Sequence, residues 1–156
     1  MKIVYVHHAE REHGNKAKPR REQDITEDGI KEAVLLSKKM HYLNPTAIYT
    51  SPYLRCYHTA TILNKEVNVP IIKDDRFNEF DSGNETYKEF LERNISALKE
   101  IIRNYNKDDV ILCVTSGVNL SAFTCYFSGN TPSNDTPKVQ GLTISPVLFT
   151  TDDNVL

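Results

Sequence analysis

Two adjacent histidines, His7 and His8, follow directly after the apolar run of residues 2–6. A histidine at the end of a buried strand can act as a nucleophile, a general base or a metal ligand. Position alone favours a simpler interpretation, a hydrogen-bonded surface histidine. Adjacent side chains on an extended chain point in different directions, so this doublet is poorly suited to bind one metal ion. No other His, Cys or Asp spacing indicates a metal.

The elements that must position these histidines alternate between strands and helices. Apolar runs predict buried strands at residues 2–6, 47–50 and 110–114, a short edge strand at 69–72 and a last strand at 142–149, with Pro146 at an edge or a bulge. Helices are predicted from Thr26 to about Asn44-Pro45, from the Ser51 cap with Pro52 first in the helix to about Asn64, from Thr86 onward, and from Gly117 to about Phe127.

This alternation predicts an α/β fold, a three-layer sandwich with a mostly parallel central sheet. Ligands of such folds bind beyond the carboxyl ends of the strands. Three strand ends, His7-His8, Thr50-Ser51 and residues 115–117, should therefore lie close together in space although they are far apart in the sequence.

Length and composition exclude several classes of protein. The 156 residues are expected to form a single domain over 1–156, and the net charge of −2 gives no indication of a nucleic-acid or membrane partner. No apolar run approaches the roughly 18 residues that span a bilayer, and residues 1–6 are too short for a signal peptide. The three cysteines are widely spaced and suggest no disulfide framework, so we expect a reduced, cytoplasmic protein.

Five segments, in order, resemble the histidine phosphatase (phosphoglycerate mutase-like) superfamily. Residues 6–10 resemble its strand-Arg-His-Gly-Glu motif, and residues 25–33 resemble Leu-Thr-x-x-Gly-x-x-Gln-Ala. The most specific match is Ser-Pro-x-x-Arg-x-x-x-Thr-Ala at residues 51–60. Residues 75–83 resemble the Arg-Leu-x-Glu segment, and residues 110–117 resemble the strand that ends in Ser-His-Gly. The chain is closest in size to the small bacterial phosphatases of the family.

The resemblance implies a role for each matching residue. His8 would attack a phosphate and become phosphohistidine, and Arg55 would contact the transferring phosphoryl group, for which a planar two-pronged cation is well suited. Glu79 would donate the proton to the leaving group, although Asp81 or Glu85 could fill that role. The remaining phosphate contacts would come from His7, Ser116 and Gly117, the last at a helix start where free N–H groups favour anions.

Two of these positions depart from the family pattern, which makes the predicted site degenerate. His7 stands where the family has arginine, and Ser116 where it has a second histidine. Loss of one preorganised donor commonly costs about a hundred- to a thousandfold in rate, so the site should bind phosphate-like anions but stabilise the transition state poorly. A basic stretch could supply the missing charge if its loop folds over the strand ends, although a solvated loop is the simpler interpretation; it comprises Arg11, Lys16, Lys18, Arg20 and Arg21.

Three functional interpretations follow. The first is a phosphomonoester hydrolase of reduced activity that acts through a phosphohistidine at His8, and the second is a regulatory module that binds a phosphorylated ligand without hydrolysing it. The third, a purely structural protein, explains the retention of His8, Arg55, Glu79 and Gly117 less well, because packing does not need them. The first two require no cofactor, and their partner is a phosphorylated small molecule or a phosphoprotein. No pattern indicates an oligomeric state.

Overall fold

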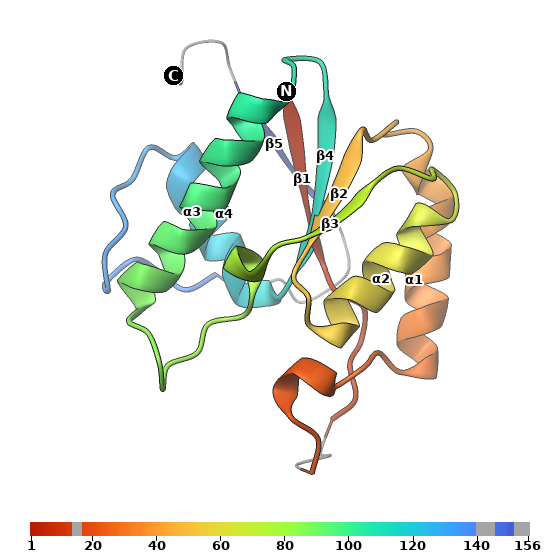
Figure 1. The fold of residues 1–156 in the computed structure, drawn as a ribbon, viewed down its shortest axis with the longest axis horizontal. Coiled ribbons are helices and arrows are strands. Elements are labelled where there is room, and N and C mark those ends of the chain that lie inside the picture. The colour runs from red at the N-terminus through yellow and green to blue at the C-terminus, as the bar shows by residue number, and fades with distance from the viewer. Residues whose placement is uncertain (14–16, 140–145, 152–156) are drawn as a thin grey trace.

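A five-stranded sheet of order β3-β2-β4-β1-β5 forms the centre of the protein (Figure 1). The computed structural model describes residues 1–13, 17–139 and 146–151. The strands are β1 (Lys2–His7), β2 (Ala47–Thr50), β3 (Ile71–Lys73), β4 (Val110–Thr115) and β5 (Val147–Thr150). Four of them run parallel, and β5 joins the outer edge of β1 in the antiparallel sense. The predicted mostly parallel sheet is therefore confirmed.

Helices cover both faces of the sheet, which gives three layers (Figure 1). They are α1 (Glu27–Met40), α2 (Leu54–Asn64), α3 (Tyr87–Asn104) and α4 (Leu120–Phe127), with 3-10 turns η1 (Arg20–Glu22), η2 (Asp75–Phe77) and η3 (Gly117–Asn119). Among the described residues, none of these helices has both the length and the apolar character that crossing a membrane would take.

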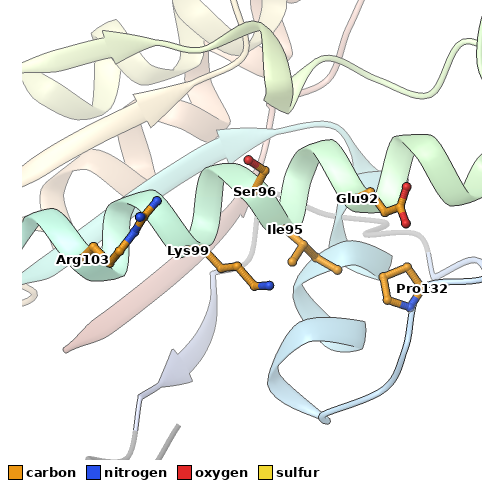
Figure 2. A pocket seen from close by; sticks show the side chains of 6 residues that line it. All are labelled: Glu92, Ile95, Ser96, Lys99, Arg103 and Pro132. Carbon is orange, nitrogen blue, oxygen red and sulfur yellow. The ribbon is translucent and has the colours of Figure 1, made fainter. Parts of the chain in front are cut away.

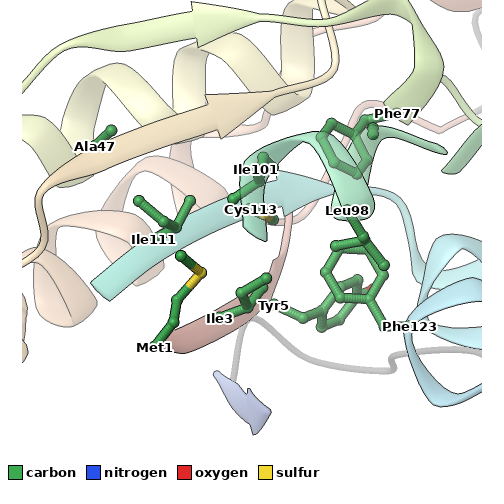
Figure 3. Close-up of a cluster of buried hydrophobic side chains, with 11 residues drawn as sticks. Met1, Ile3, Tyr5, Ala47, Phe77, Leu98, Ile101, Ile111, Cys113 and Phe123 are labelled. Carbon is green, nitrogen blue, oxygen red and sulfur yellow. The ribbon is translucent and has the colours of Figure 1, made fainter. Parts of the chain in front are cut away.

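Alternation along β1 divides the core between the two faces, because successive side chains of a strand point to opposite sides. Ile3 and Tyr5 pack with residues of α3 and α4 such as Leu98 and Phe123 (Figure 3). Val4 and Val6 pack on the opposite face with residues that include Met40 of α1 and Leu63 of α2. Strands buried on both faces read as continuous apolar runs, and this explains the clear sequence signal of β1 and β4.

The predicted helix starts at Thr26 and Thr86 are confirmed by their caps. Thr26 accepts the backbone N–H of Gly29, and Thr86 forms a reciprocal capping box with Glu89. The predicted end of α1 near Asn44-Pro45 is too late: the helix stops at Met40, and turns lead to Asn44, whose φ of 44° lies in the left-handed region. Helical backbone angles are disfavoured for a residue that precedes a proline, here Asn44. Helix α1 ends before it reaches that residue.

The predicted start of α2 at Ser51 and Pro52 is wrong, because α2 begins at Leu54. The Ser51 hydroxyl donates to the side-chain oxygen of Asn78 at 2.7 Å and accepts the Tyr53 N–H at 3.3 Å. Ser51 therefore forms a local turn and a contact with the segment after η2 instead of capping the helix. The segment after Ser116 also begins with a 3-10 turn, η3, before α4.

The remaining strand predictions hold within the described residues. β3 is an edge strand that starts directly after Pro70, which agrees with a proline outside the hydrogen-bonded ladder. β5 is the opposite edge, as Pro146 suggests, whereas residues 142–145 of the predicted last strand lie outside the described residues. The polar composition of residues 73–86 predicts an irregular segment, yet it contains η2, whose Phe77 is fully buried in the core.

Gly29 fixes the contact between α1 and the segment after β1. A Cβ at this position would collide with the backbone oxygen of Glu10, two residues beyond His8. We predict that Gly29→Ala lowers the free energy of unfolding by about 1–3 kcal/mol, because a backbone clash outweighs the gain in helix propensity of roughly 1 kcal/mol.

Gly83→Ala is the matched control for this change. Its Cβ would meet only the Asp81 side chain, at 3.5 Å, so its stability should change by less than about 0.5 kcal/mol. Urea unfolding of both variants measures the difference. Equal stability of the two variants would show that the backbone of Glu10 leaves room for a side chain at position 29.

Candidate functional site

The carboxyl ends of β2, β4 and β1 meet at one edge of the sheet, as the sequence predicts. His7 pairs in register with Thr115, and Thr50 pairs with Val114. Beyond the strands, the His8 N–H donates to the Thr115 carbonyl at 3.0 Å, and the Ser51 N–H donates to the Val114 carbonyl at 3.1 Å. These bonds extend the ladder past the strand ends and hold His8 beside the segment that carries Ser116.

The backbone carbonyl of Ala9 holds the His8 ring in one tautomer. Its Nδ1 lies 2.7 Å from the Ala9 carbonyl oxygen. Because a carbonyl can only accept, Nδ1 must carry the proton, and Nε2 of the neutral ring keeps its lone pair. The Ala9 N–H in turn donates to the Thr59 hydroxyl, which donates to the Arg55 carbonyl of α2. The segment after β1 and helix α2 are therefore linked by hydrogen bonds next to His8.

Burial of His8 keeps its ring uncharged at neutral pH. The side chain is buried, with 7% of the residue exposed, and this desolvation is the main reason that its pKa falls from 6.5 to about 3. Charge interactions with His7, Arg55 and Arg11 lower the pKa further, whereas the hydrogen bond to Ala9 raises it. An uncharged imidazole with a free Nε2 lone pair is the form that can act as a nucleophile.

The low pKa of His8 makes stability depend on pH. The unfolded chain takes up this proton near pH 6.5, whereas the folded chain does so only near pH 3, so stability falls as the pH drops through this window. Between pH 7 and pH 5 we expect His8 alone to cost wild type about 2 kcal/mol. Urea unfolding should show a smaller acid-induced loss for His8→Asn, and equal losses in both proteins would contradict the buried, neutral state.

The rings of His7 and His8 lie together, with centroids 4.4 Å apart. The expectation that the two side chains diverge is therefore wrong. Within residues 1–13, 17–139 and 146–151, no group of three or more His, Cys, Asp or Glu side chains could hold a metal ion.

Arg55 is a buried charge at the same edge, on the first turn of α2, with 1% of the residue exposed. Its Nη1 donates to the Arg20 carbonyl at 2.7 Å, and its Nη2 donates to Glu79 at 2.8 Å. Its Nε is buried and has no hydrogen-bond partner among the described residues. A buried donor without a partner is costly, and an anion bound at this position would satisfy it.

Glu79 is the acidic side chain that contacts Arg55. Its Oε2 accepts hydrogen bonds from both Arg55 and Arg20. The two alternative acids have other partners: Asp81 accepts from Gly83 and Asn84, and Glu85 pairs with Arg93. These contacts favour Glu79 over Asp81 and Glu85 as the acid next to Arg55.

Ser116 belongs to a buried polar network that no sequence pattern reveals. Its hydroxyl donates to the Asn119 side-chain oxygen at 2.5 Å, and the Asn119 amide donates to Asn94 and to the carbonyls of Phe77 and Asn78. The Tyr5 hydroxyl donates to the Ser116 carbonyl at 2.9 Å. Since a hydroxyl has one proton, Ser116 could donate to a phosphate only by releasing Asn119. Gly117 follows as the first residue of η3.

Arg20 is the described member of the basic stretch after His8 that forms hydrogen bonds with Arg55 and Glu79. Arg20 contacts Glu79 with its side chain and Arg55 with its carbonyl. Lys18 pairs with Glu12, Arg11 donates to Gln23, Arg21 is exposed, and Lys16 lies outside the described residues. His58 pairs with Asp24 at 2.8 Å, which supports a structural role for this histidine.

A separate pocket of about 390 Å³ lies along α3 (Figure 2). It includes none of the predicted site residues; its lining comprises Glu92, Ile95, Ser96, Lys99, Arg103 and Pro132. The candidate site is therefore defined by the buried polar groups at the strand ends and not by this pocket.

Comparison with known proteins identifies the class that this fold and site define. Residues 3–84 and 81–156 match the model of the histidine phosphatase superfamily (branch 1). The chain therefore belongs to the histidine phosphatase superfamily, as the five motifs indicate. Phosphoserine phosphatase 1 of Hydrogenobacter thermophilus is 34% identical over 85 residues, which are 53% of this chain and 40% of that protein. The chain spans about half or less of the curated relatives that it matches.

Solved structures with the same fold cover nearly the whole chain. YhfR of Bacillus stearothermophilus has a TM-score of 0.80 at 20% identity, and the match covers 97% of this chain and 92% of YhfR. A mycobacterial glucosyl-3-phosphoglycerate phosphatase, solved with VO3, has a TM-score of 0.79 at 15% identity, and the match covers 94% of this chain and 91% of that one. The three-layer sandwich is thus the phosphoglycerate mutase-like fold.

Proposed function

We propose that this protein is a phosphomonoester hydrolase that acts through a phosphohistidine at His8. The observation that carries the proposal is the state of His8: buried, uncharged, and held by the Ala9 carbonyl in the tautomer that leaves Nε2 unprotonated. A surface histidine would need neither the burial nor the fixed tautomer. Membership of the histidine phosphatase superfamily supports the same assignment.

The neighbouring groups have chemically distinct roles in this reaction. Nε2 of His8 attacks phosphorus, and an N–P bond forms as the bond from phosphorus to the leaving oxygen breaks. Arg55 holds the equatorial phosphoryl oxygens, with the start of η3 at Gly117 as a further anion contact. Glu79, released from Arg55 by the bound phosphate and carrying a proton, gives that proton to the leaving oxygen. Water then attacks the phosphohistidine, returns a proton to Glu79 and releases inorganic phosphate.

The substrate class follows from this chemistry and from the relatives. The mechanism needs a phosphate monoester whose leaving group can reach Glu79, either on a small molecule or on a protein. Relatives named as a phosphoserine phosphatase and a glucosyl-3-phosphoglycerate phosphatase support a phosphorylated small molecule. The reaction as written draws on no cofactor.

A second candidate function is a module that binds a phosphorylated ligand without hydrolysing it. It is favoured by Ser116, whose proton is committed to Asn119, and by His7 in the position of the family's arginine. Both changes weaken stabilisation of the transition state more than binding of the ground state.

Steady-state hydrolysis of p-nitrophenyl phosphate, combined with calorimetric titration of inorganic phosphate, separates the two functions. The proposed hydrolase both binds phosphate and turns over the ester. Phosphate binding with no turnover of this ester or of phosphoserine would favour the binding module, and no phosphate binding at all would contradict both.

A further inference from the structure

The carboxylate oxygen Oε2 of Glu79 is the meeting point of two guanidinium groups. Nη2 of Arg55 donates to it at 2.8 Å, and Nη2 of Arg20 donates to it at 2.6 Å. Two cations that converge on one oxygen mark a position where an oxyanion is strongly favoured. A phosphoryl oxygen has the same hydrogen-bonding character as this carboxylate oxygen, and it could receive both donors.

We propose that Arg20 is a second phosphate-binding arginine, which grips the substrate together with Arg55 at the position that Glu79 occupies in the free protein. The inference rests on the proposed function. It adds a residue from outside the five motifs, and it assigns a specific task to one member of the basic stretch after His8. In the free protein, Glu79 acts as the internal counter-ion of the two arginines.

The charge requirement of the substrate supports a second cation. A phosphate monoester approaches the dianion at neutral pH, whereas Arg55 carries a single positive charge. His8 adds none, because its low pKa keeps the ring neutral. The residue that precedes it, where the family has arginine, is His7. Arg20 restores a second full positive charge next to Arg55.

The backbone around Arg20 holds it in place. The Arg20 carbonyl accepts Nη1 of Arg55 at 2.7 Å, so the position of η1 is tied to the buried guanidinium. The turn itself is closed by the bond from the Glu22 N–H to the Pro19 carbonyl. The Arg20 side chain is 60% exposed, which leaves it accessible to an incoming ligand. In Figure 1, η1 lies beside the first turn of α2, where Arg55 is located.

The exposure of Arg20 sets the size of its effect. A fully buried charge-assisted bond contributes more than an exposed one, so we expect Arg20→Ala to weaken phosphate binding by about five- to tenfold at low ionic strength. Arg55→Ala should reduce it much further. Glu79→Gln removes the competing anion while keeping a similar shape, and it should tighten phosphate binding severalfold.

Arg21→Ala is the matched control, because Arg21 lies in the same turn, is exposed and carries the same charge. The experiment is calorimetric titration of the full chain with inorganic phosphate and with orthovanadate, for wild type and the four variants. The expected result is weaker binding by Arg20→Ala, tighter binding by Glu79→Gln, and unchanged binding by Arg21→Ala. Thermal unfolding of each variant verifies that the exposed substitutions leave the fold intact.

Different results of the titration would contradict the role of Arg20 alone or the proposed function as well. If Arg20→Ala binds both anions like wild type while Arg55→Ala loses them, the role of Arg20 is wrong and the proposed function stands. If Arg20→Ala and Arg21→Ala weaken anion binding equally, only the general charge of the loop matters, and the specific contact of Arg20 with the phosphate is also wrong. If wild type binds neither anion, the proposed function fails together with the inference.

Discussion

Replacing His8 with alanine is expected to reduce the turnover of p-nitrophenyl phosphate by roughly a thousandfold or more, because the change removes the proposed nucleophile. The effect should fall on kcat, since the phosphate contacts that we propose for Arg55 remain. Initial rates over a range of substrate concentrations separate kcat from KM.

His58→Ala is the control for this change. His58 is a partly buried histidine on α2, and its side chain pairs with Asp24 at 2.8 Å. We expect its activity to stay within about twofold of wild type, as for a residue outside the reacting groups. Substantial residual turnover in His8→Ala, at a level close to that of His58→Ala, would rule out His8 as the nucleophile.

The second large effect is expected at Arg55. Arg55→Lys should lower kcat/KM by about a hundred- to a thousandfold, because an ammonium group cannot hold two phosphoryl oxygens in a fixed planar geometry. The same change should lower stability, since Arg55 ties the Arg20 carbonyl and Glu79 together from a buried position. Kinetics and urea unfolding measure the two effects separately.

Arg76→Lys is the matched control for the arginine. Arg76 is likewise ion-paired, with Asp74 and Glu100, and the hydrogen bonds of its side chain go to those two residues. It should lose some stability and keep most of its activity. If Arg55→Lys retained wild-type kcat/KM, Arg55 would have a structural role alone, and its unpartnered Nε would need another explanation.

The sequence predicts the strand ends well, because apolar runs and local caps are determined by neighbouring residues. Buried runs locate β1, β2 and β4, and the carboxyl-end rule alone is enough to bring His8, Ser51 and Ser116 to one edge of the sheet. Thr26 and Thr86 identify helix starts by a local hydrogen bond that involves residues only three positions apart.

Long-range contacts account for what the sequence does not predict. Ser51 is a good local cap, but Asn78, 27 residues away, accepts its hydroxyl and delays the start of α2 to Leu54. Asn119, which holds the Ser116 hydroxyl, reaches Asn94 across 25 residues, and no periodic pattern marks such a partner. Arg20 contacts Glu79 across 59 residues. The sequence of the basic stretch therefore shows the charge of Arg20 but not where its side chain lies.

The most direct test of a phosphohistidine at His8 is to trap the phosphoenzyme. The protein is mixed with a substrate that carries a ³²P-labelled phosphoryl group, quenched with alkali, and digested to locate the label. We expect label that is stable to alkali, labile to acid and confined to the peptide with His8, and no label in His8→Ala. Turnover by wild type with no labelled protein, or label on another residue, would contradict it.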